Sequence, residues 1–378
     1  MKFLHTADWH VGKTLAGRNR SDEHSAVLSE VVDLARAESV DAVLVAGDLF
    51  DSAAPSPAAE DIVYSTLLSL RDAAPVVVVP GNHDSLNRLK AMTPLFGRAG
   101  ITVRAGLDLH PVRIETGDGP LEVACIPWLS QRFIVKATQL MDLGAKESND
   151  LFRDRMQQLV DAMNARFSGD SVRVLMAHLT VPDAEHGGGE RTAQTIFDYW
   201  VPTGVFPNTL QYVALGHIHK MQNMPGPAPV WYAGSPLHLD FSDSDDSKST
   251  LMVEVAAGTP AKVRAIELTA GRRLRTIEGT LDQLKALGDQ GDDFLRVRVH
   301  EQGRTGLGDE VRELFPNAVK VIVESEIDAT GRKPGKSRSD ASAHELFIDY
   351  LKTKRVDDPP LVKLFEEIHE EIDASGTT

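Results

Sequence analysis

The stretch VVVVPGNHDS, residues 76–85, joins a strongly apolar run to a cluster of polar side chains. Four consecutive valines favour a strand that is buried on both faces, because β-branched side chains pack well on a pleated surface. The chain then turns at a Pro-Gly pair and places Asn82, His83 and Asp84 directly after the strand. Gly-Asn alone is also a common turn sequence, so a functional interpretation needs support from the rest of the chain.

Similar polar clusters follow other apolar runs of the chain. Asp8 and His10 follow the first run, Asp48 the second, His178 a later one, and the pair His217 and His219 another. The carboxyl ends of neighbouring strands meet at one edge of an α/β sheet, so residues as distant as 8 and 219 can share one crevice. A lone Asp-x-His or His-x-His pair is a weak signal. Its repetition at successive strand ends is hard to assign to chance.

These strand ends supply a mixed set of metal donors. The set comprises Asp8, His10, Asp48, Asn82, His178, His217 and His219. Carboxylate, imidazole and amide donors without sulfur suit divalent first-row metals such as Mn, Fe or Zn. Alternate residues of a strand point the same way, so we expect both members of each spaced pair to face the metals. Two ions roughly 3.5 to 4 Å apart activate water and stabilise phosphoryl oxygens, which predicts phosphoester hydrolysis.

The bulk composition sets limits on the function. The chain has 378 residues, enough for one large domain and one or two smaller ones. Its 40 basic and 55 acidic residues give a net charge of −15, which argues against wholesale attraction to nucleic acid unless metal ions and a partner add positive charge. The single Cys125 excludes an intrachain disulfide and fits a reducing cytoplasm. No run approaches the roughly 20 apolar residues of a membrane span, so we expect no membrane association.

The order of apolar runs predicts the architecture. Strands alternating with helices, followed by consecutive strands, indicate a layered α/β domain with two packed sheets flanked by helices over residues 1–270. Residues 271–330 predict a small α+β domain, and the basic, Gly-, Pro- and Ser-containing segment 331–340 predicts a linker. Residues 341–378 contain two short amphipathic helices without neighbouring strands. We expect them to bind another apolar surface, and the alternative is that they fold back on their own domain.

The strand-end motifs resemble those of the calcineurin-like metallophosphoesterase superfamily. Further stretches resemble the family of nuclease chains found in bacterial SbcCD exonucleases: HTADWHVGKTLAGRNR, GDLFDSAAPSP, MAHLTV, LGHIH, YAGSPLHLDF, DEVRELFPNAVKVIVES and HELFIDYL. The last two are the most specific, because generic phosphatases of the superfamily lack them. The resemblance implies a two-sheet α/β/β/α metallophosphoesterase sandwich and a capping domain that helps to select DNA. It also implies C-terminal helices that bind the coiled coil of the ATPase subunit, SbcC.

The resemblance also implies roles for single residues. One metal ion would be held by Asp8, His10, Asp48 and His219 and the other by Asp48, Asn82, His178 and His217, with Asp48 bridging; both ions would be Mn²⁺. His83 takes the position of the catalytic histidine that approaches the scissile phosphate, and Asp84 is expected to orient its imidazole from behind. Archaeal and eukaryotic relatives carry a second histidine where this chain has Asp51, so the role of that histidine does not carry over.

The predicted function is that of a metal-dependent DNA nuclease subunit, with double-strand exonuclease and single-strand or hairpin endonuclease activity. It would act with SbcC in DNA end processing, repair and recombination, as a homodimer within a heterotetramer, with residues 62–70 and 86–96 as candidate dimer helices. Basic residues that could contact DNA phosphates are Lys13, Arg18, Arg20, Arg88, Lys90, Arg132, Arg272, Arg273 and Arg275, none of them assigned.

Two other functions compete with this prediction. The first is a free-standing phosphodiesterase or phosphatase that acts on small molecules or phosphoproteins with the same metal site. The chain after residue 270 opposes it, because a generic member needs neither a capping domain nor a tethered helix pair. The second is a non-catalytic interaction module on a degenerate fold, which the complete set of donors opposes.

Overall fold

The computed structural model describes residues 1–129, 145–187, 200–243, 247–324, 347–348, 350–351 and 360–365. Arg132, the predicted linker 331–340 and most of the predicted C-terminal helices lie outside these residues. The chain divides into two compact units, one formed by residues 1–14 and 19–271 and the other by residues 15–18 and 272–378. Among the described residues no helix is both long and apolar enough to cross a membrane.

The first sheet contains the strand formed by the four valines. Its order is β12 (Lys262–Glu267), β11 (Ser249–Glu254), β1 (Lys2–Thr6), β2 (Ala42–Ala46), β3 (Val76–Val79) and β4 (Ile101–Val103). The last four strands are parallel, and the helices α1 (Ser21–Ala37), α2 (Pro57–Ala73) and α3 (Leu86–Arg98) connect them. Parallel pairing therefore places the carboxyl ends of β1, β2 and β3 at one edge of the sheet.

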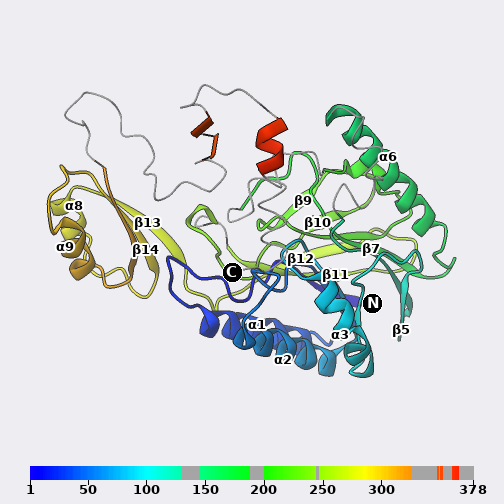
Figure 1. Ribbon diagram of the computed structural model, residues 1–378. Helices are drawn as coiled ribbons and strands as arrows, with labels where there is room; N and C mark the ends of the chain where they lie inside the picture. Colours follow the sequence, from blue (N-terminus) through cyan, green and yellow to red (C-terminus); the bar gives the residue numbers. More distant parts are fainter. Residues whose placement is uncertain are drawn as a thin grey trace. The chain divides into compact units, whose positions relative to one another are not determined.

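The second sheet has the order β5 (Val112–Thr116), β6 (Gly119–Ile126), β7 (Val172–His178), β8 (Tyr212–Gly216), β10 (Val230–Tyr232) and β9 (Gln222–Met224). β6, β7, β8 and β10 are parallel. The helix α6 (Ala145–Asn164) packs on this sheet through Phe152, Met156 and Val160. Figure 1 shows α1, α2 and α3 on one side of the unit and α6 on the opposite side.

The core of the first unit lies in three layers that follow the alternation of side chains along each strand. Val76 and Val78 pack toward the helices of the first sheet, whereas Val77 and Val79 pack between the two sheets. Both faces of β3 are thus buried, which explains why its sequence is continuously apolar. The prediction of two packed sheets flanked by helices is confirmed.

The second unit contains a three-stranded parallel sheet, β13 (Leu274–Gly279), β14 (Phe294–Val299) and β15 (Ala318–Val323). The helices α8 (Leu281–Ala286) and α9 (Leu307–Leu314) connect the strands and supply Leu284 and Val311 to the core of this unit. Thr280 begins α8 with a capping box, because its hydroxyl accepts from the Gln283 N–H while the Gln283 side chain accepts from the Thr280 N–H.

Candidate metal centre

All seven predicted ligands lie at the carboxyl ends of strands. Asp8 and His10 follow β1, Asp48 follows β2 and Asn82 follows β3 in the first sheet; His178 ends β7, and His217 and His219 follow β8 in the second sheet. Six of them are at most 2% exposed, and Asn82 is half-buried. The two sheets thus bring together side chains that are as far apart in the sequence as Asp8 and His219.

The donors form overlapping groups whose ligand atoms lie within 4.8 Å of one another. The groups are Asp8, His10 and His219; Asp48, His178 and His217; and His10, Asp48 and His83. The first two groups correspond to the two predicted metal sites, apart from Asn82 and the shared Asp48. The third joins them to the predicted catalytic histidine.

Four donors have a backbone conformation that non-glycine residues rarely adopt. The φ angles of Asp8, His10, Asp48 and His217 are 52°, 46°, 50° and 102°, and each such residue costs roughly 1–3 kcal/mol. Backbone hydrogen bonds hold two of them, from Asp8 N to Gly47 O and from His10 N to Asp48 O, both 3.0 Å. The prediction that strand alternation aligns Asp8 with His10 is therefore wrong, because β1 ends at Thr6 and tight turns after it aim both side chains.

Two glycines leave room for this arrangement. A Cβ atom on Gly81 would overlap the carboxylate and the backbone N–H of Asp48. Gly47 has φ 95°, and a Cβ atom there would overlap Nδ1 of His178. The glycines in the strand-end motifs therefore allow a neighbouring strand to place its donor directly against the turn.

In the first group, nitrogen atoms of two imidazoles face each other. Nε2 of His10 lies 3.0 Å from Nε2 of His219. The Asp8 carboxylate belongs to the same group and accepts from the His217 N–H at 2.9 and 3.1 Å. Behind the site, the carbonyl oxygen of His219 accepts from the buried Lys248 ammonium at 3.3 Å. His10 and His219 could both hold a cation through these nitrogens, and the cation would satisfy their lone pairs.

In the second group, possible ligand atoms of four residues converge. Nδ1 of His178 donates to Ala46 O at 2.8 Å, so Nε2 is the nitrogen that faces the site, 2.9 Å from Asn82 Oδ1 and 3.4 Å from Asp48 Oδ2. Nδ1 of His217 lies 3.0 Å from Asn82 Oδ1, and its buried Nε2 has no hydrogen-bond partner among the described residues. This donor set fits a divalent cation, which would bind the lone pairs of these closely spaced ligand atoms.

Asp48 lies between the two groups. Its Oδ2 atom is 3.4 Å from Nε2 of His10 and 3.4 Å from Nε2 of His178. Burial opposes its ionisation, but His178, His83 and His10 hold the pKa of this carboxyl well below its usual range. Burial likewise opposes protonation of His178, yet Asp48 and Asp8 raise its pKa to about 9. The proton on His178 balances the negative charge of the Asp48 carboxylate, and a bound cation would replace that proton.

The imidazole of His83 is held by the backbone. Its Nδ1 donates to Asp51 O at 2.8 Å, and its backbone N–H donates to Asp48 Oδ1 at 2.8 Å. The His83 ring lies perpendicular to the His10 ring, with centroids 4.5 Å apart. Nδ1 of His83 is therefore held by the backbone, and the ring lies beside the metal donors His10 and Asp48.

The prediction that Asp84 orients His83 is wrong. The Asp84 carboxylate accepts from the backbone N–H groups of Leu49, Phe50 and Gly81 at 3.2, 3.1 and 2.9 Å. It therefore ties the turn after β2 to the turn after β3. Burial and the charge of Asp48 raise the pKa of Asp84 to about 7, whereas the three N–H groups oppose that shift.

The sequence did not predict two contacts in the site. The Asp51 carbonyl, not a side chain, orients His83. The half-buried Trp128 packs its ring on the second group, 5.1 Å from the His217 ring at 31° and 6.0 Å from the His178 ring. Trp128 follows the carboxyl end of β6, so the strand-end criterion could have found it had it included aromatic residues.

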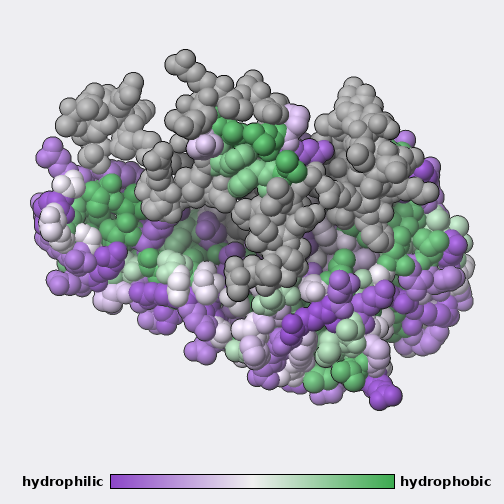
Figure 2. All heavy atoms as spheres, in the orientation of Figure 1, coloured by the Kyte–Doolittle hydropathy of each residue, from purple (hydrophilic) through white to green (hydrophobic). Residues whose placement is uncertain are grey.

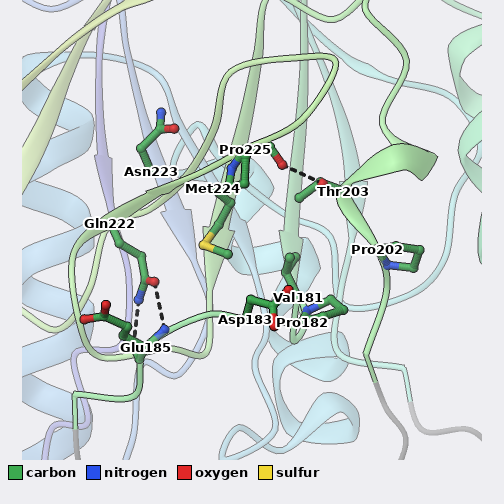
Figure 3. A pocket seen from close by; sticks show the side chains of 10 residues that line it. All are labelled: Val181, Pro182, Asp183, Glu185, Pro202, Thr203, Gln222, Asn223, Met224 and Pro225. Carbon is green, nitrogen blue, oxygen red and sulfur yellow. Dashed lines mark hydrogen bonds between the residues drawn. The ribbon is translucent and has the colours of Figure 1, made fainter.

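A separate pocket of about 460 Å³ lies beyond the carboxyl end of β7, next to β9 and the short helix η1 (Thr203–Val205). Figure 3 shows Gln222 tied to Glu185 by two hydrogen bonds and Thr203 bonded to Pro225. Val181, Pro182 and Met224 supply much of its apolar lining. None of the seven donors lines this pocket, so the metal chemistry does not take place there.

Comparisons with known proteins identify the family. The calcineurin-like phosphoesterase family matches residues 1–221. The chain is 30% identical to the D subunit of nuclease SbcCD from Bacillus subtilis, covering 97% of each chain. It is 35% identical to the same protein of Rhodobacter capsulatus, over 68% of this chain and 67% of that one. With the Escherichia coli K12 protein of this name the identity is 30%, over 78% and 74%.

These matches confirm the predicted resemblance and the assignment as a hydrolase of a family that uses divalent metal ions. They agree with the fold, because the family match spans β1 to the turn after β8, where all seven donors lie. The chain therefore belongs to the calcineurin-like phosphoesterase family and, within it, groups with the D subunits of SbcCD nucleases.

Proposed function

We propose that this chain is the nuclease subunit of an SbcCD-type complex and hydrolyses phosphodiester bonds in DNA. The observation that carries the proposal is the convergence of seven donors from both sheets, in a chain that matches a nuclease subunit over 97% of its length. The predicted activity comprises double-strand exonuclease and single-strand or hairpin endonuclease cleavage. It would serve DNA end processing, repair and recombination in the cytoplasm.

The proposed metal ligands are those that the resemblance implied. One ion is held by Asp8, His10, Asp48 and His219 and the other by Asp48, Asn82, His178 and His217. The position of Asp48 Oδ2, 3.4 Å from a histidine nitrogen of each group, supports a bridging role. We favour Mn²⁺, because oxygen and imidazole donors without sulfur suit it. The ions would supply Lewis acidity and a nucleophile at neutral pH.

His83 is the proposed catalytic residue. The Asp51 carbonyl holds the proton on Nδ1 whether the ring is neutral or charged. When the ring is protonated, Nε2 can donate to the phosphate and then pass its proton to the leaving oxygen. Since His83 is only 5% exposed, bulk water competes poorly for this proton.

The ATPase SbcC is the proposed partner, and it would bind the C-terminal segment. Among the described residues there, the Phe347 and Phe365 rings stack with centroids 4.1 Å apart at 11°, and Tyr350 and Leu364 are exposed. Figure 2 shows an apolar patch where Figure 1 draws these segments in red. Exposed apolar side chains on short helices suit a partner helix, such as one strand of a coiled coil.

A homodimer within a heterotetramer is the proposed assembly. Exposed leucines on two packed helices support it, Leu68 on α2 and Leu95 on α3. The helices contact each other through Tyr64 and Phe96 and through the Arg88–Glu60 ion pair. A free-standing phosphatase is not favoured, because the match to nuclease subunits extends over nearly the whole chain.

The test compares substrates and partners directly. The purified chain with Mn²⁺, with and without the ATPase subunit, is given duplex ends, hairpins and a small phosphodiester. The proposal expects all three to be cleaved and the DNA activities to respond to the ATPase and ATP. Hydrolysis of the small substrate alone, even with the partner, would instead assign a generic phosphodiesterase. Deletion of residues 331–378 should abolish binding of the ATPase and spare hydrolysis of the small phosphodiester. Retained binding would favour helices that fold back on their own domain.

A further inference from the structure

Asp51 occupies a central position in the turn after β2. Its backbone N–H donates to Val11 O at 3.2 Å, and its carbonyl oxygen accepts from His83 Nδ1 at 2.8 Å. These two bonds connect the turn after β1 with the turn after β3. The backbone of Asp51 is therefore fixed on both sides, and its side chain can be aimed with little freedom.

The carboxylate of Asp51 faces the outer nitrogen of a metal donor. Its Oδ1 atom lies 3.6 Å from Nδ1 of His10 and 3.3 Å from Nζ of Lys13. Both Oδ1 of Asp51 and Nδ1 of His10 are buried without a hydrogen-bond partner among the described residues. A separation of 3.6 Å is longer than a hydrogen bond, yet a shift of about 0.5 Å would make one. The Asp51 side chain is 31% exposed, so a small rotation of its carboxylate can supply that shift while the backbone stays fixed.

His10 has a competing way to place its proton. Its Nε2 lies 3.0 Å from Nε2 of His219, so a proton on Nε2 would form a hydrogen bond between the two rings. In that tautomer the lone pair of His10 is on Nδ1, which faces Asp51 rather than His219, and Nε2 offers none to a metal. A proton on Nδ1 instead leaves the Nε2 lone pair of His10 to bind an ion.

We propose that Asp51 is a positioning residue that accepts Nδ1–H of His10 and thereby selects the tautomer that binds metal. The inference rests on the proposed function in one respect, namely that His10 is a metal ligand. Carboxylates that hold the outer nitrogen of a ligating histidine fix its tautomer and raise its basicity. Lys13 compensates the charge of the Asp51 carboxylate. No described bond joins the Lys13 side chain to His10.

The ion pair with Lys13 does not by itself account for the arrangement. Lys13 and Asp51 are 25% and 31% exposed, and an ion pair at such a position contributes little to stability. It also gives no reason for a carboxylate oxygen to be buried against an imidazole nitrogen. The proposed hydrogen bond to His10 would supply that reason.

The test measures metal affinity rather than catalysis. Mn²⁺ binding to the full chain is measured by calorimetry for wild type, Asp51→Asn and Asp51→Ala. Asp51→Ala removes the acceptor, so affinity should fall about 10- to 100-fold, the usual effect of losing such a partner. Asp51→Asn keeps an oxygen that can accept a hydrogen bond from Nδ1–H of His10. Its Mn²⁺ affinity should therefore fall clearly less than that of Asp51→Ala. The melting temperature of the metal-free protein should change little in either variant.

Glu185→Gln is the matched control. Glu185 forms an ion pair with Lys220 at 2.6 Å, next in sequence to the donor His219, but contacts no donor through its carboxylate. The Mn²⁺ affinity of Glu185→Gln should equal that of wild type. Saturating Mn²⁺ should restore hydrolysis of a small phosphodiester to Asp51→Ala, because the variant still has every ligand.

A second measurement reads the tautomer. In the Zn²⁺-loaded protein labelled with ¹⁵N-histidine, wild type and Asp51→Asn should show a slowly exchanging His10 Nδ1–H, which Asp51→Ala should lose. Unchanged affinity in Asp51→Ala, or equal losses in Asp51→Ala and Asp51→Asn, would overturn the proposal. Failure of wild type to cleave DNA would sink the nuclease assignment and leave the affinity comparison intact.

Discussion

The imidazole of His178 in the second sheet donates through Nδ1 to the carbonyl oxygen of Ala46 in the first sheet, 2.8 Å away. This bond crosses from β7 to β2, so the contact between the sheets also determines the tautomer of a metal donor. It directs Nε2 of His178 toward Asn82 and Asp48. The metal centre is therefore coupled to the packing of the two sheets, and changes at their interface should alter metal binding.

Gly47→Ala tests this coupling. At φ 95° an alanine is strained by roughly 1–2 kcal/mol, and its Cβ atom would also overlap Nδ1 of His178. We expect a loss of at least about 2 kcal/mol in the free energy of unfolding, measured with urea, together with weaker Mn²⁺ binding. Gly117→Ala is the control, because no atom lies near its Cβ position. Equal effects of the two substitutions would show that the overlap is relieved without moving His178.

Asp48→Asn tests the bridging role. The amide has the size of the carboxylate but no charge, and Asp48 Oδ2 lies 3.4 Å from a histidine nitrogen of each group. We expect the number of bound Mn²⁺ ions to fall from two to at most one and hydrolysis to fall to background. Asp33→Asn is the control, since this carboxylate of α1 is largely exposed and forms an ion pair with Arg36. Two bound ions in Asp48→Asn would contradict a bridge.

His83→Gln separates proton transfer from metal binding. His83 contacts Asp51 O and Asp48 Oδ1, but its ring is not one of the proposed ligands. We expect both ions to remain bound and kcat for a small phosphodiester to fall by about 10² or more, the usual contribution of a general acid or base. His110→Gln, at an exposed histidine, should leave kcat unchanged. Cleavage by His83→Gln at the wild-type rate would remove His83 from the mechanism.

The positions of the donors could be predicted because they depend on topology alone. Parallel strands share an edge, so reading the residue after each apolar run was enough to find Asp48 and Asn82 without knowing any angle. The orientation of the side chains was not predictable in the same way. Asp8 and His10 lie beyond the end of β1 at positive φ, and no periodicity of the sequence indicates such a turn.

The partner of His83 illustrates a second limit. Asp84 is its neighbour in the sequence, and the predicted role of Asp84 is to orient the His83 imidazole from behind. The structure instead uses a backbone carbonyl from Asp51, and every residue has a carbonyl, so the sequence carries no signal for it. Trp128 was missed for a different reason, because the search at strand ends considered only residues that can bind metal.

Trp128→Ala tests whether the indole stabilises the second group of donors. Its ring packs on His217 with centroids 5.1 Å apart at 31°, and such a contact contributes about 0.5–1.5 kcal/mol. We expect about 2- to 10-fold weaker binding of one of the two Mn²⁺ ions, measured by calorimetry. Trp128→Phe keeps an aromatic face and should retain most of the affinity. If Trp128→Ala binds both ions as wild type does, the indole has no part in holding His217.

The acid stability of the fold should depend on His24, a buried histidine of α1 outside the metal centre. Burial lowers its pKa to about 4, and its Nδ1 lies 3.0 Å from Arg20 O while Nε2 has no hydrogen-bond partner among the described residues. The unfolded chain binds this proton near pH 6.5 and the folded chain only near pH 4. The part of the free energy of unfolding that depends on neutral His24 is therefore complete above pH 6.5 and declines as the pH falls toward 4, by about 3 kcal/mol.

Urea unfolding with EDTA from about pH 7 to 4 tests this dependence. The free energy of unfolding should decline less steeply for His24→Gln than for wild type, while the exposed His110→Gln should follow wild type. Parallel curves for wild type and His24→Gln would mean that another group causes the loss at low pH.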